Sequence, residues 1–328
     1  MSSTSWGALI TNGLILTMAR FLIKKILYSL ISLFVMVSLT FIMMKSLPGD
    51  PFSEEKALPP EVIASLKHHY ALDTSLTHQY VTYLYSVVTL NFGPSLVHPT
   101  MTVGDIIRTS FPVSAVIGIQ ALFLSLLLGV ISGTWSAFLS NRFEQKILMV
   151  IGICMISVPS FIVASILQYF FGVYHEYLPI ARWGTWEHTI LPTIALTTFP
   201  LALIARLVRN NMVQILKLDY IRNARAKGLS RWEILWTHAL PNAIIPVIGY
   251  MGPLFSSILV GSFVIEKIFG IPGLGQWFVA SIMNRDYPVI MGTAVFYSTL
   301  LTLFVFMADC LYCFVDPRIH LRSHPCNV

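Results

Sequence analysis

Charged side chains are scarce in this chain. Asp, Glu, Lys and Arg make up 11% of its 328 residues, whereas a soluble globular protein carries about 25%. Hydrophobic residues make up 55%, and the mean hydropathy is +0.73. A large soluble core would still need a charged surface around it, and so few charges cannot supply one. The composition therefore predicts an integral membrane protein, whose lipid-facing surface needs no charge.

Signatures of catalysis and of nucleotide binding are missing as well. A phosphate-binding P-loop needs Gly-Lys followed by Ser or Thr, and the dipeptide Gly-Lys does not occur in the sequence. Neither a His-Glu-x-x-His motif nor a Ser-His-Asp arrangement stands out. We therefore expect that the chain is not an enzyme and binds no cofactor itself. The energy for any transport must come from a partner or an ion gradient.

Potential metal and disulfide ligands are few. They are Cys154, Cys310, Cys313, Cys326, His68, His69 and His78. Cys310 and Cys313 form a Cys-x-x-Cys pair, but the pair lies in a hydrophobic run, where cysteine serves most often as a small apolar residue. The histidines fall in a segment predicted to lie outside the membrane, where most histidines are unliganded. The sequence predicts no metal site.

Six long runs of the sequence are free of charge. A helix needs about 20 mostly apolar residues to cross a bilayer. The runs are Ile26–Met44, 109–141, 147–174, 189–205, Ala239–Ile265, and 287–308 with an extension toward Val315. They predict an all-α membrane protein with six transmembrane helices. The fourth run is the shortest and gives the weakest prediction of a span.

This pattern divides the chain into a tail, a first span with an external segment, and a core. Residues 1–20 form the tail, in which the stretch that begins at Met18 looks like a natural start. Residues 21–110 hold the first span and the external segment. Residues 111–320 hold the remaining spans, with a long loop at 206–240, and residues 321–328 form a C-terminal tail. The first run is too long for a signal-peptide core, so we expect it to remain as a span.

Positive charge is unevenly distributed between the two sides of the predicted membrane protein. The side that carries both termini holds 14 of the 21 Lys and Arg residues. Cytoplasmic loops carry an excess of these residues, so both termini are predicted to be cytoplasmic. The segment from Lys45 to Arg108 is then external. In a membrane protein the net charge of +6 is interpreted through this distribution among the loops, and binding to nucleic acid is not predicted.

The loop between the fourth and fifth runs has the most informative pattern. It predicts a short helix at about Tyr220–Lys227 that ends at Gly228, because glycine favours the cap at a helix C-terminus. Ser230 is predicted to cap a second helix, with Glu233 placed as in a capping box. The basic residues of the loop are Arg222, Arg225, Lys227 and Arg231, and its small residues are Ala224, Ala226 and Gly228.

Three interpretations of this basic loop remain open on physical grounds. It is a solvated loop of the positive-inside kind, a basic amphipathic helix on anionic lipid, or a docking surface for a cytoplasmic partner. The small residues would let another backbone approach closely, as docking requires.

The loop resembles the cytoplasmic signature of permease subunits of bacterial ATP-binding-cassette importers. That signature is Glu-Ala-Ala-x-x-x-Gly, nine further residues, and Ile-x-Leu-Pro. The matching residues are Ala224, Gly228, Leu240 and Pro241. Arg222, Asn223 and His238 stand where the signature has Glu, Ala and Ile, so the match is partial. The stretch 224–229, Ala-Arg-Ala-Lys-Gly-Leu, is instead similar to the dipeptide, oligopeptide and nickel branch, where the Glu is usually absent.

Further stretches resemble the same branch, in the same order along the chain. They are Leu-Pro-Gly-Asp-Pro at 47–51, Leu72-Asp73 with Gln79-Tyr80, Phe-Gly-Ile-Pro-Gly-Leu-Gly at 269–275, Asn-Arg-Asp-Tyr-Pro at 284–288, and Asp-Pro-Arg-Ile at 316–319. Each is weak alone, but the ordered set is specific. The long external segment is similar to that of the first permease of a pair.

The resemblance implies a type I importer permease fold, in which an N-terminal helix and an external segment are added to a five-helix core. It implies a second permease that completes a heterodimeric pore, two cytoplasmic ATPases that bind ATP and magnesium, and an extracytoplasmic peptide-binding protein. Membrane lipid surrounds such a protein. The implied location is the bacterial inner membrane. The implied cargo is a dipeptide or an oligopeptide, with nickel or another small solute as the alternative.

The resemblance also implies which residues couple ATP hydrolysis to transport. In the family, the signature helix sits in a groove of the ATPase. The implied coupling residues are Asp219, Arg222, Ala224, Arg225, Ala226, Lys227, Gly228, Leu229, Leu240 and Pro241. Pore residues are predicted from small and polar side chains in the fifth run, which are Gly249, Gly252, Ser256, Ser257 and Gly261. Such residues serve equally well in helix packing.

Asp309 carries the main alternative function. It is the one acid placed within a predicted span, and intramembrane acids often relay protons. A relay would make the chain an ion-coupled secondary transporter. The other interpretation is that Asp309 lies near the cytoplasmic end and pairs with a basic group. The glycine-rich stretch 270–275 has no strand before it, so we expect an external loop that gates the pore or contacts the binding protein, rather than a dinucleotide site.

Overall fold

The computed structural model describes residues 3–46, 73–139, 142–259 and 263–315. The chain in these ranges is helical apart from its loops and one isolated β-bridge between Pro94 and Thr102. The helices are α1 (Ser3–Ser46), α3 (Leu76–Thr89), α4 (Val103–Phe138), α5 (Arg142–Ser157), α6 (Ser160–Leu167), η1 (Gln168–Tyr174), α7 (Glu187–Ile215), α8 (Asp219–Ala226), α9 (Arg231–Glu233), η2 (Ile234–Ala239), α10 (Leu240–Ala243), α11 (Ile245–Leu259), α12 (Phe263–Phe269), α13 (Leu274–Met283) and α14 (Tyr287–Val315). The sequence motifs at 47–51 and 316–319, together with His68, His69, Leu72 and Gly261, lie outside the described residues.

Four of these helices are long and apolar enough to cross a membrane without a break. They are Ile23–Ser46 within α1, α4, α7, and Tyr287–Tyr312 within α14. Two further pairs of helices are each bent at a short break. Phe143–Ser157 and Ser160–Tyr174 meet at 99°, and Arg231–Ala243 and Ile245–Ile258 meet at 48°. The number of spans is the predicted six if each bent pair crosses once.

The weak points of the spans lie at prolines rather than at the shortest charge-free run. Proline has no backbone N–H and interrupts a helix, and Pro159 stands at the 99° bend while Pro246 follows the 48° bend. The fourth run was expected to be the weakest span, and this expectation was wrong. Arg206 ends the apolar run but not the helix, because α7 continues unbroken from Glu187 to Ile215.

Small residues bring the central helices into close contact. A Cβ atom on Gly133 of α4 would lie 2.5 Å from the carbonyl oxygen of Ala205 in α7, and one on Gly129 would lie 2.9 Å from Ile204. In α11, a Cβ on Gly252 would lie 2.8 Å from the Cα of Val305 in α14. Without a hydrophobic driving force between helices in lipid, such close packing holds helices together.

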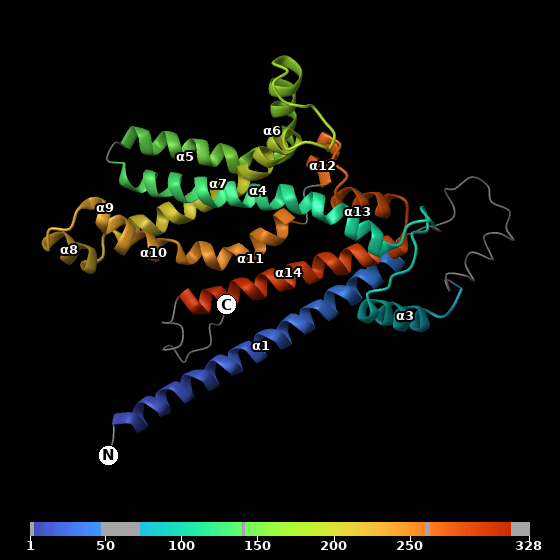
Figure 1. Cartoon of the computed structure of the whole chain (residues 1–328), viewed down its shortest axis with the longest axis horizontal. Helices are drawn as coiled ribbons and strands as arrows, with labels where there is room; N and C mark the ends of the chain where they lie inside the picture. Colours follow the sequence, from blue (N-terminus) through green and yellow to red (C-terminus); the bar gives the residue numbers. More distant parts are fainter. Residues whose placement is uncertain (1–2, 47–72, 140–141, 260–262, 316–328) are drawn as a thin grey trace.

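The helices give the molecule two opposite ends (Figure 1). The start of α1, the turn from α4 to α5, and α8 with α9 lie at one end, at the left of the figure. Helices α3 and α13 lie at the other end, with α12 nearby. We call these the α8 end and the α3 end. The predicted coupling loop and the glycine-rich loop are therefore separated by the length of the spans.

Candidate functional site

The predicted coupling helix is present at the α8 end and projects from it (Figure 1). Helix α8 runs from Asp219 to Ala226, in good agreement with the predicted Tyr220–Lys227. The helix is amphipathic, with one buried face and one exposed face. Ile221 and Ala224 are buried against the chain, whereas the side chains of Asp219, Arg222, Arg225, Ala226 and Lys227 are exposed. The exposed face is thus mostly basic and free to meet a partner.

Both predicted caps of this loop are confirmed. Gly228 has φ +84, a left-handed conformation that glycine adopts without strain. Its N–H donates to the carbonyl of Arg225, and the N–H of Leu229 donates to the carbonyl of Ala224, which closes the helix end. The Ser230 hydroxyl accepts a hydrogen bond from the N–H of Glu233 at 3.2 Å and so starts α9.

Two residues that sequence reasoning missed attach α8 to the following helices. The carbonyl of His238 accepts hydrogen bonds from the Tyr220 hydroxyl at 3.3 Å and from the Asn242 side-chain amide at 2.8 Å. The Asn242 amide also donates to the Tyr220 hydroxyl at 3.4 Å. A carbonyl in the widened helical turn η2 thereby finds side-chain partners. The link ties α8 to the end of the first helix of the 48° bent pair, next to the bend.

The remaining signature residues of the loop have different environments. Ala224 and Leu240 are buried in one apolar cluster with Met212, Ile221, Ile234 and Leu235, and Leu229 packs against that cluster. Pro241 is exposed. Of the three small residues, only Ala226 and Gly228 are accessible to another backbone. Arg222 forms a long contact of 3.3 Å with Asp219, and both side chains are largely exposed, so this pair adds little stability.

The pore candidates of α11 fall into two groups. Gly252 and Ser256 are buried, Gly252 against α14, and the Ser256 hydroxyl donates to the Gly252 carbonyl at 3.1 Å. These two residues serve helix packing within the chain. Gly249 and Ser257 are exposed and are the members of the set that a pore or a second subunit can reach.

Asp309 pairs with a basic group, as its structural interpretation requires. Its carboxylate lies 2.7 Å from the ammonium group of Lys25, and each side chain is about one-third exposed, at 33% and 36%. The pair joins α1 to α14. The Asp309 carboxylate therefore forms an ion pair with a cation of the same chain.

At the α3 end, the glycine-rich loop surrounds a buried carboxylate that sequence reasoning missed. Glu266 of α12 is only 3% exposed. It accepts hydrogen bonds from the Ser114 hydroxyl of α4 at 2.7 Å and from the N–H of Gln276 at 3.1 Å. The Ser114 hydroxyl in turn accepts from the N–H of Leu274 at 2.9 Å. The carboxylate therefore sits at the N-terminus of α13, where the helix dipole favours a negative charge.

The glycines of that loop are explained by the carboxylate. A Cβ atom on Gly273 would lie 2.6 Å from both oxygens of Glu266, and one on Gly275 would lie 2.9 Å from the nearer oxygen. Only glycine leaves room for the side chain. The stretch 270–275 is therefore a loop that fastens α12, α13 and α4 together around the Glu266 carboxylate.

A second buried acid fastens the loop before α4 to the start of α14. Asp286 is 3% exposed and accepts hydrogen bonds from the Ser95 hydroxyl and from the N–H of Leu96, the latter at 3.1 Å. The stretch 284–288 thus has a structural role at the α3 end. Among the described residues, no group of three His, Cys, Asp or Glu side chains is placed to hold a metal ion.

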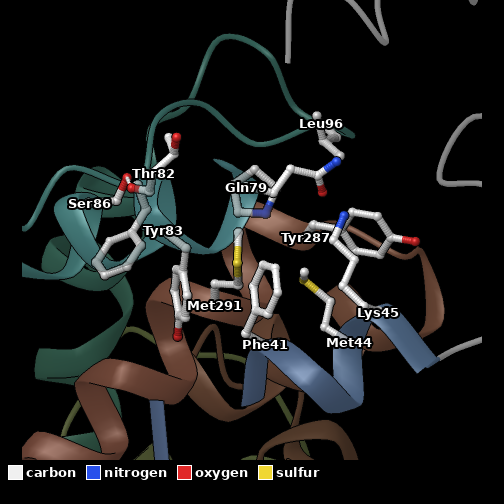
Figure 2. Close-up of a pocket in the computed structure, with 12 residues that line it drawn as sticks. Phe41, Met44, Lys45, Gln79, Thr82, Tyr83, Ser86, Leu96, Tyr287 and Met291 are labelled. Atoms are coloured by element: carbon white, nitrogen blue, oxygen red, sulfur yellow. Dashed lines mark hydrogen bonds between the residues drawn. The ribbon is translucent and has the colours of Figure 1, made fainter. Parts of the chain in front are cut away.

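A cavity next to this junction is lined by α1, α3 and α14 (Figure 2). Its volume is about 160 Å³, below the roughly 300–1,000 Å³ of typical ligand sites. Figure 2 shows the Lys45 side chain beside the ring of Tyr287, with the ammonium group 5.4 Å from the ring centroid and 6.0 Å from that of Phe41. The cation–π contact with Tyr287 joins the end of α1 to α14, and the contact with Phe41 lies within α1. The cavity belongs to a helix junction and is too small for a peptide.

Comparison with known proteins identifies relatives over nearly the whole chain. The family described as "Binding-protein-dependent transport system inner membrane component" matches residues 125–321. The family described as "Binding-prot-dependent transport system membrane comp, N-term" matches residues 18–117. The dipeptide transport system permease protein DppB of Bacillus subtilis (strain 168) is 46% identical over 306 residues, which cover 93% of this chain and 99% of DppB.

Other relatives are similar over the same extent. DppB of Lactococcus lactis subsp. cremoris is 42% identical over 304 residues, covering 93% of this chain and all of the relative. The oligopeptide transport system permease protein OppB of Escherichia coli (strain K12) is 39% identical over 304 residues, covering 92% and 99%. These matches confirm the resemblance seen in the sequence.

A solved structure shares the fold. A chain of the MetNI methionine ABC transporter, in an inward-facing conformation, superimposes with a TM-score of 0.53 at 17% identity, covering 64% of this chain and 96% of that chain. At this identity the likeness concerns the fold alone, and it confirms the predicted importer permease architecture. The chain belongs to the family of binding-protein-dependent transport system inner membrane components, and it is a multi-pass transport permease rather than an enzyme.

Proposed function

We propose that this chain forms half of the translocation pore of an ATP-driven importer of dipeptides or oligopeptides. The observation that carries the proposal is the 39–46% identity, over more than nine-tenths of the chain, to relatives named as dipeptide and oligopeptide permeases. The exposed basic face of α8 supports it, because a signature helix that docks on an ATPase must project from the spans.

The proposal includes the partners and the orientation of the chain. A second permease completes a heterodimeric pore, two ATPases dock at the α8 end, and a peptide-binding protein docks at the α3 end. The α8 end faces the cytoplasm, together with both termini, because its loops hold most of the Lys and Arg residues. ATP is bound by the partner subunits, since this chain has no Gly-Lys dipeptide for a P-loop.

Uptake is expected to depend on ATP and to survive the loss of the Asp309 carboxylate. The measurement is uptake of a radiolabelled dipeptide by proteoliposomes that contain the complete transporter and its binding protein, with and without ATP. We expect Asp309→Asn to retain uptake within about twofold, because the carboxylate pairs with Lys25 of the same chain and the asparagine carbonyl oxygen can still accept a hydrogen bond from the Lys25 ammonium group.

A proton-coupled carrier would behave in the opposite way. Uptake would proceed without ATP under an imposed proton gradient, and Asp309→Asn would abolish it. That pair of results would overturn the proposed importer. Lys25→Met serves as the matched variant, since it removes the other member of the pair and leaves the carboxylate in place.

A further inference from the structure

A large apolar groove at the α8 end has no role in the proposed transport cycle. It lies between the end of α4 and the segment α9–η2, and its volume is about 470 Å³, within the range of ligand sites. We call it the tryptophan groove. It is lined by Val130, Ile131, Thr134, Trp135, Phe138, Leu139, Arg231, Trp232, Leu235, Trp236 and Leu240.

Three of the residues that line the groove are tryptophans with largely exposed side chains. Trp135 of α4, Trp232 of α9 and Trp236 of η2 are 62%, 63% and 60% exposed. Tryptophan is enriched where a membrane meets water, because its ring is apolar and its N–H is polar. Three such side chains at the end of a span place the groove at the depth of the lipid headgroups.

The floor of the groove continues into the lipid-facing surface of α4. Leu235 and Leu240 are buried and form the floor, while Leu127, Leu128 and Ile131 on the adjacent part of α4 are exposed. An acyl chain that lies along α4 can therefore enter the groove without crossing a polar barrier. A soluble ATPase would instead meet the charged side chains of α8.

The charge at the groove is positive. Arg231 is the one charged residue among its lining residues. Glu233 lies two residues further on, which is about 200° around the helix, and it does not line the groove. An arginine beside interfacial tryptophans suits a phosphate group, to which its guanidinium donates several hydrogen bonds.

We propose that the tryptophan groove binds one phospholipid of the membrane leaflet at the α8 end, with an acyl chain along Leu235 and Leu240 and the phosphate at Arg231. The site lies within the segment that Tyr220 and Asn242 tie to α8. The lipid thus lies against the segment that directly follows α8 in the chain.

Native mass spectrometry of the assembled transporter tests this proposal by counting the phospholipids retained per permease. The wild type is expected to retain one phospholipid that resists delipidation. Arg231→Ala is expected to lower its occupancy about fivefold, the effect of one cation near a membrane surface. Ile131→Trp fills the groove, keeps the arginine, and is expected to remove the lipid. Lys146→Ala, which removes an exposed cation of α5 at the same end, is expected to retain it.

Two results would overturn the site. Either unchanged occupancy in Arg231→Ala and Ile131→Trp, or an equal loss in Lys146→Ala, would show general attraction of lipid rather than a defined groove. A photoreactive benzoylphenylalanine at position 236 identifies the occupant. An adduct with the mass of a phospholipid supports the proposal, and an adduct with the second permease or the ATPase contradicts it.

Discussion

Ala226→Trp is expected to reduce ATP-driven uptake about tenfold or more while the permease still folds and inserts. Ala226 is on the exposed face of α8, where a bulky ring can extend away from the spans and occupy the space of a docking partner. Overpacking a closely fitted contact costs ~1–3 kcal/mol, and each 1.4 kcal/mol is about tenfold in affinity. Uptake and co-purification of the ATPase are measured together.

A substitution at Ala226 tests docking of the ATPase without straining the fold of the loop itself. Gly228 is also exposed, but its φ of +84 means that any larger residue would strain the loop itself. Lys146→Trp is the matched control, because it places the same ring on an exposed position of α5 at the α8 end. If Ala226→Trp leaves uptake and ATPase binding at the wild-type level, α8 is not the coupling helix.

Glu266→Ala is expected to give the largest loss of stability, lowering the Tm of the detergent-solubilised chain by about 5–10 °C. The variant removes a buried acceptor and leaves the N–H of Gln276 and the hydroxyl of Ser114 without their partner. Hydrogen bonds to a charged group contribute ~1.5–3 kcal/mol each. Differential scanning fluorimetry measures the change.

Gly273→Ala is expected to destabilise the fold because it would disturb the same hydrogen bonds of the Glu266 carboxylate. Its methyl group would lie 2.6 Å from the Glu266 oxygens and would displace the carboxylate. Gly184→Ala is the control, since a Cβ there meets nothing within 4 Å. If Gly273→Ala and Gly184→Ala have the same Tm, the carboxylate does not hold the loop.

The same carboxylate makes stability depend on pH. Burial raises the pKa of Glu266 above its ordinary value of 4.5, and hydrogen bonds from Ser114, Gln276 and Gly275 oppose the shift only in part. A raised pKa of an acid means that protonation favours the folded state. The contribution is fully present below pH 4.5 and is lost as the pH rises through the raised pKa. Glu266→Gln does not titrate, so its Tm is expected to lack this decline.

The parts of the structure that depend on local pattern were predictable from the sequence. Charge-free runs located all six candidate spans, and the cap residues Gly228 and Ser230 placed the ends of α8 and α9. Capping depends on one or two neighbouring residues, and insertion depends on a sum over a run. Both quantities can be read along the chain without knowing the fold.

The parts that depend on tertiary contacts were not predictable. Glu266 stands one residue beyond the fifth run and reads as a loop acid, and its burial follows from contact with Ser114, 152 residues earlier. The tie between Tyr220 and Asn242 requires the widened turn of η2, which no local pattern indicated. The 99° bend at Pro159 was not predictable either. Pro192 and Pro200 lie inside α7, which is unbroken, so the presence of a proline alone does not tell whether a helix bends. Proline marks where a helix can break, and the neighbours decide whether it does.

Cysteine cross-linking at position 226 tests the central claim most directly. Ala226→Cys is introduced into a chain whose four native cysteines are replaced by serine, and the assembled transporter is labelled with a maleimide that carries a photoreactive benzophenone, whose excited carbonyl inserts into C–H bonds of any neighbouring chain on irradiation. We predict a covalent product that contains this permease and an ATPase subunit, and that is absent when the cysteine is placed at Lys146 instead. A complex that transports peptide but gives no such product, although the introduced thiol reacts with the reagent, would contradict the account.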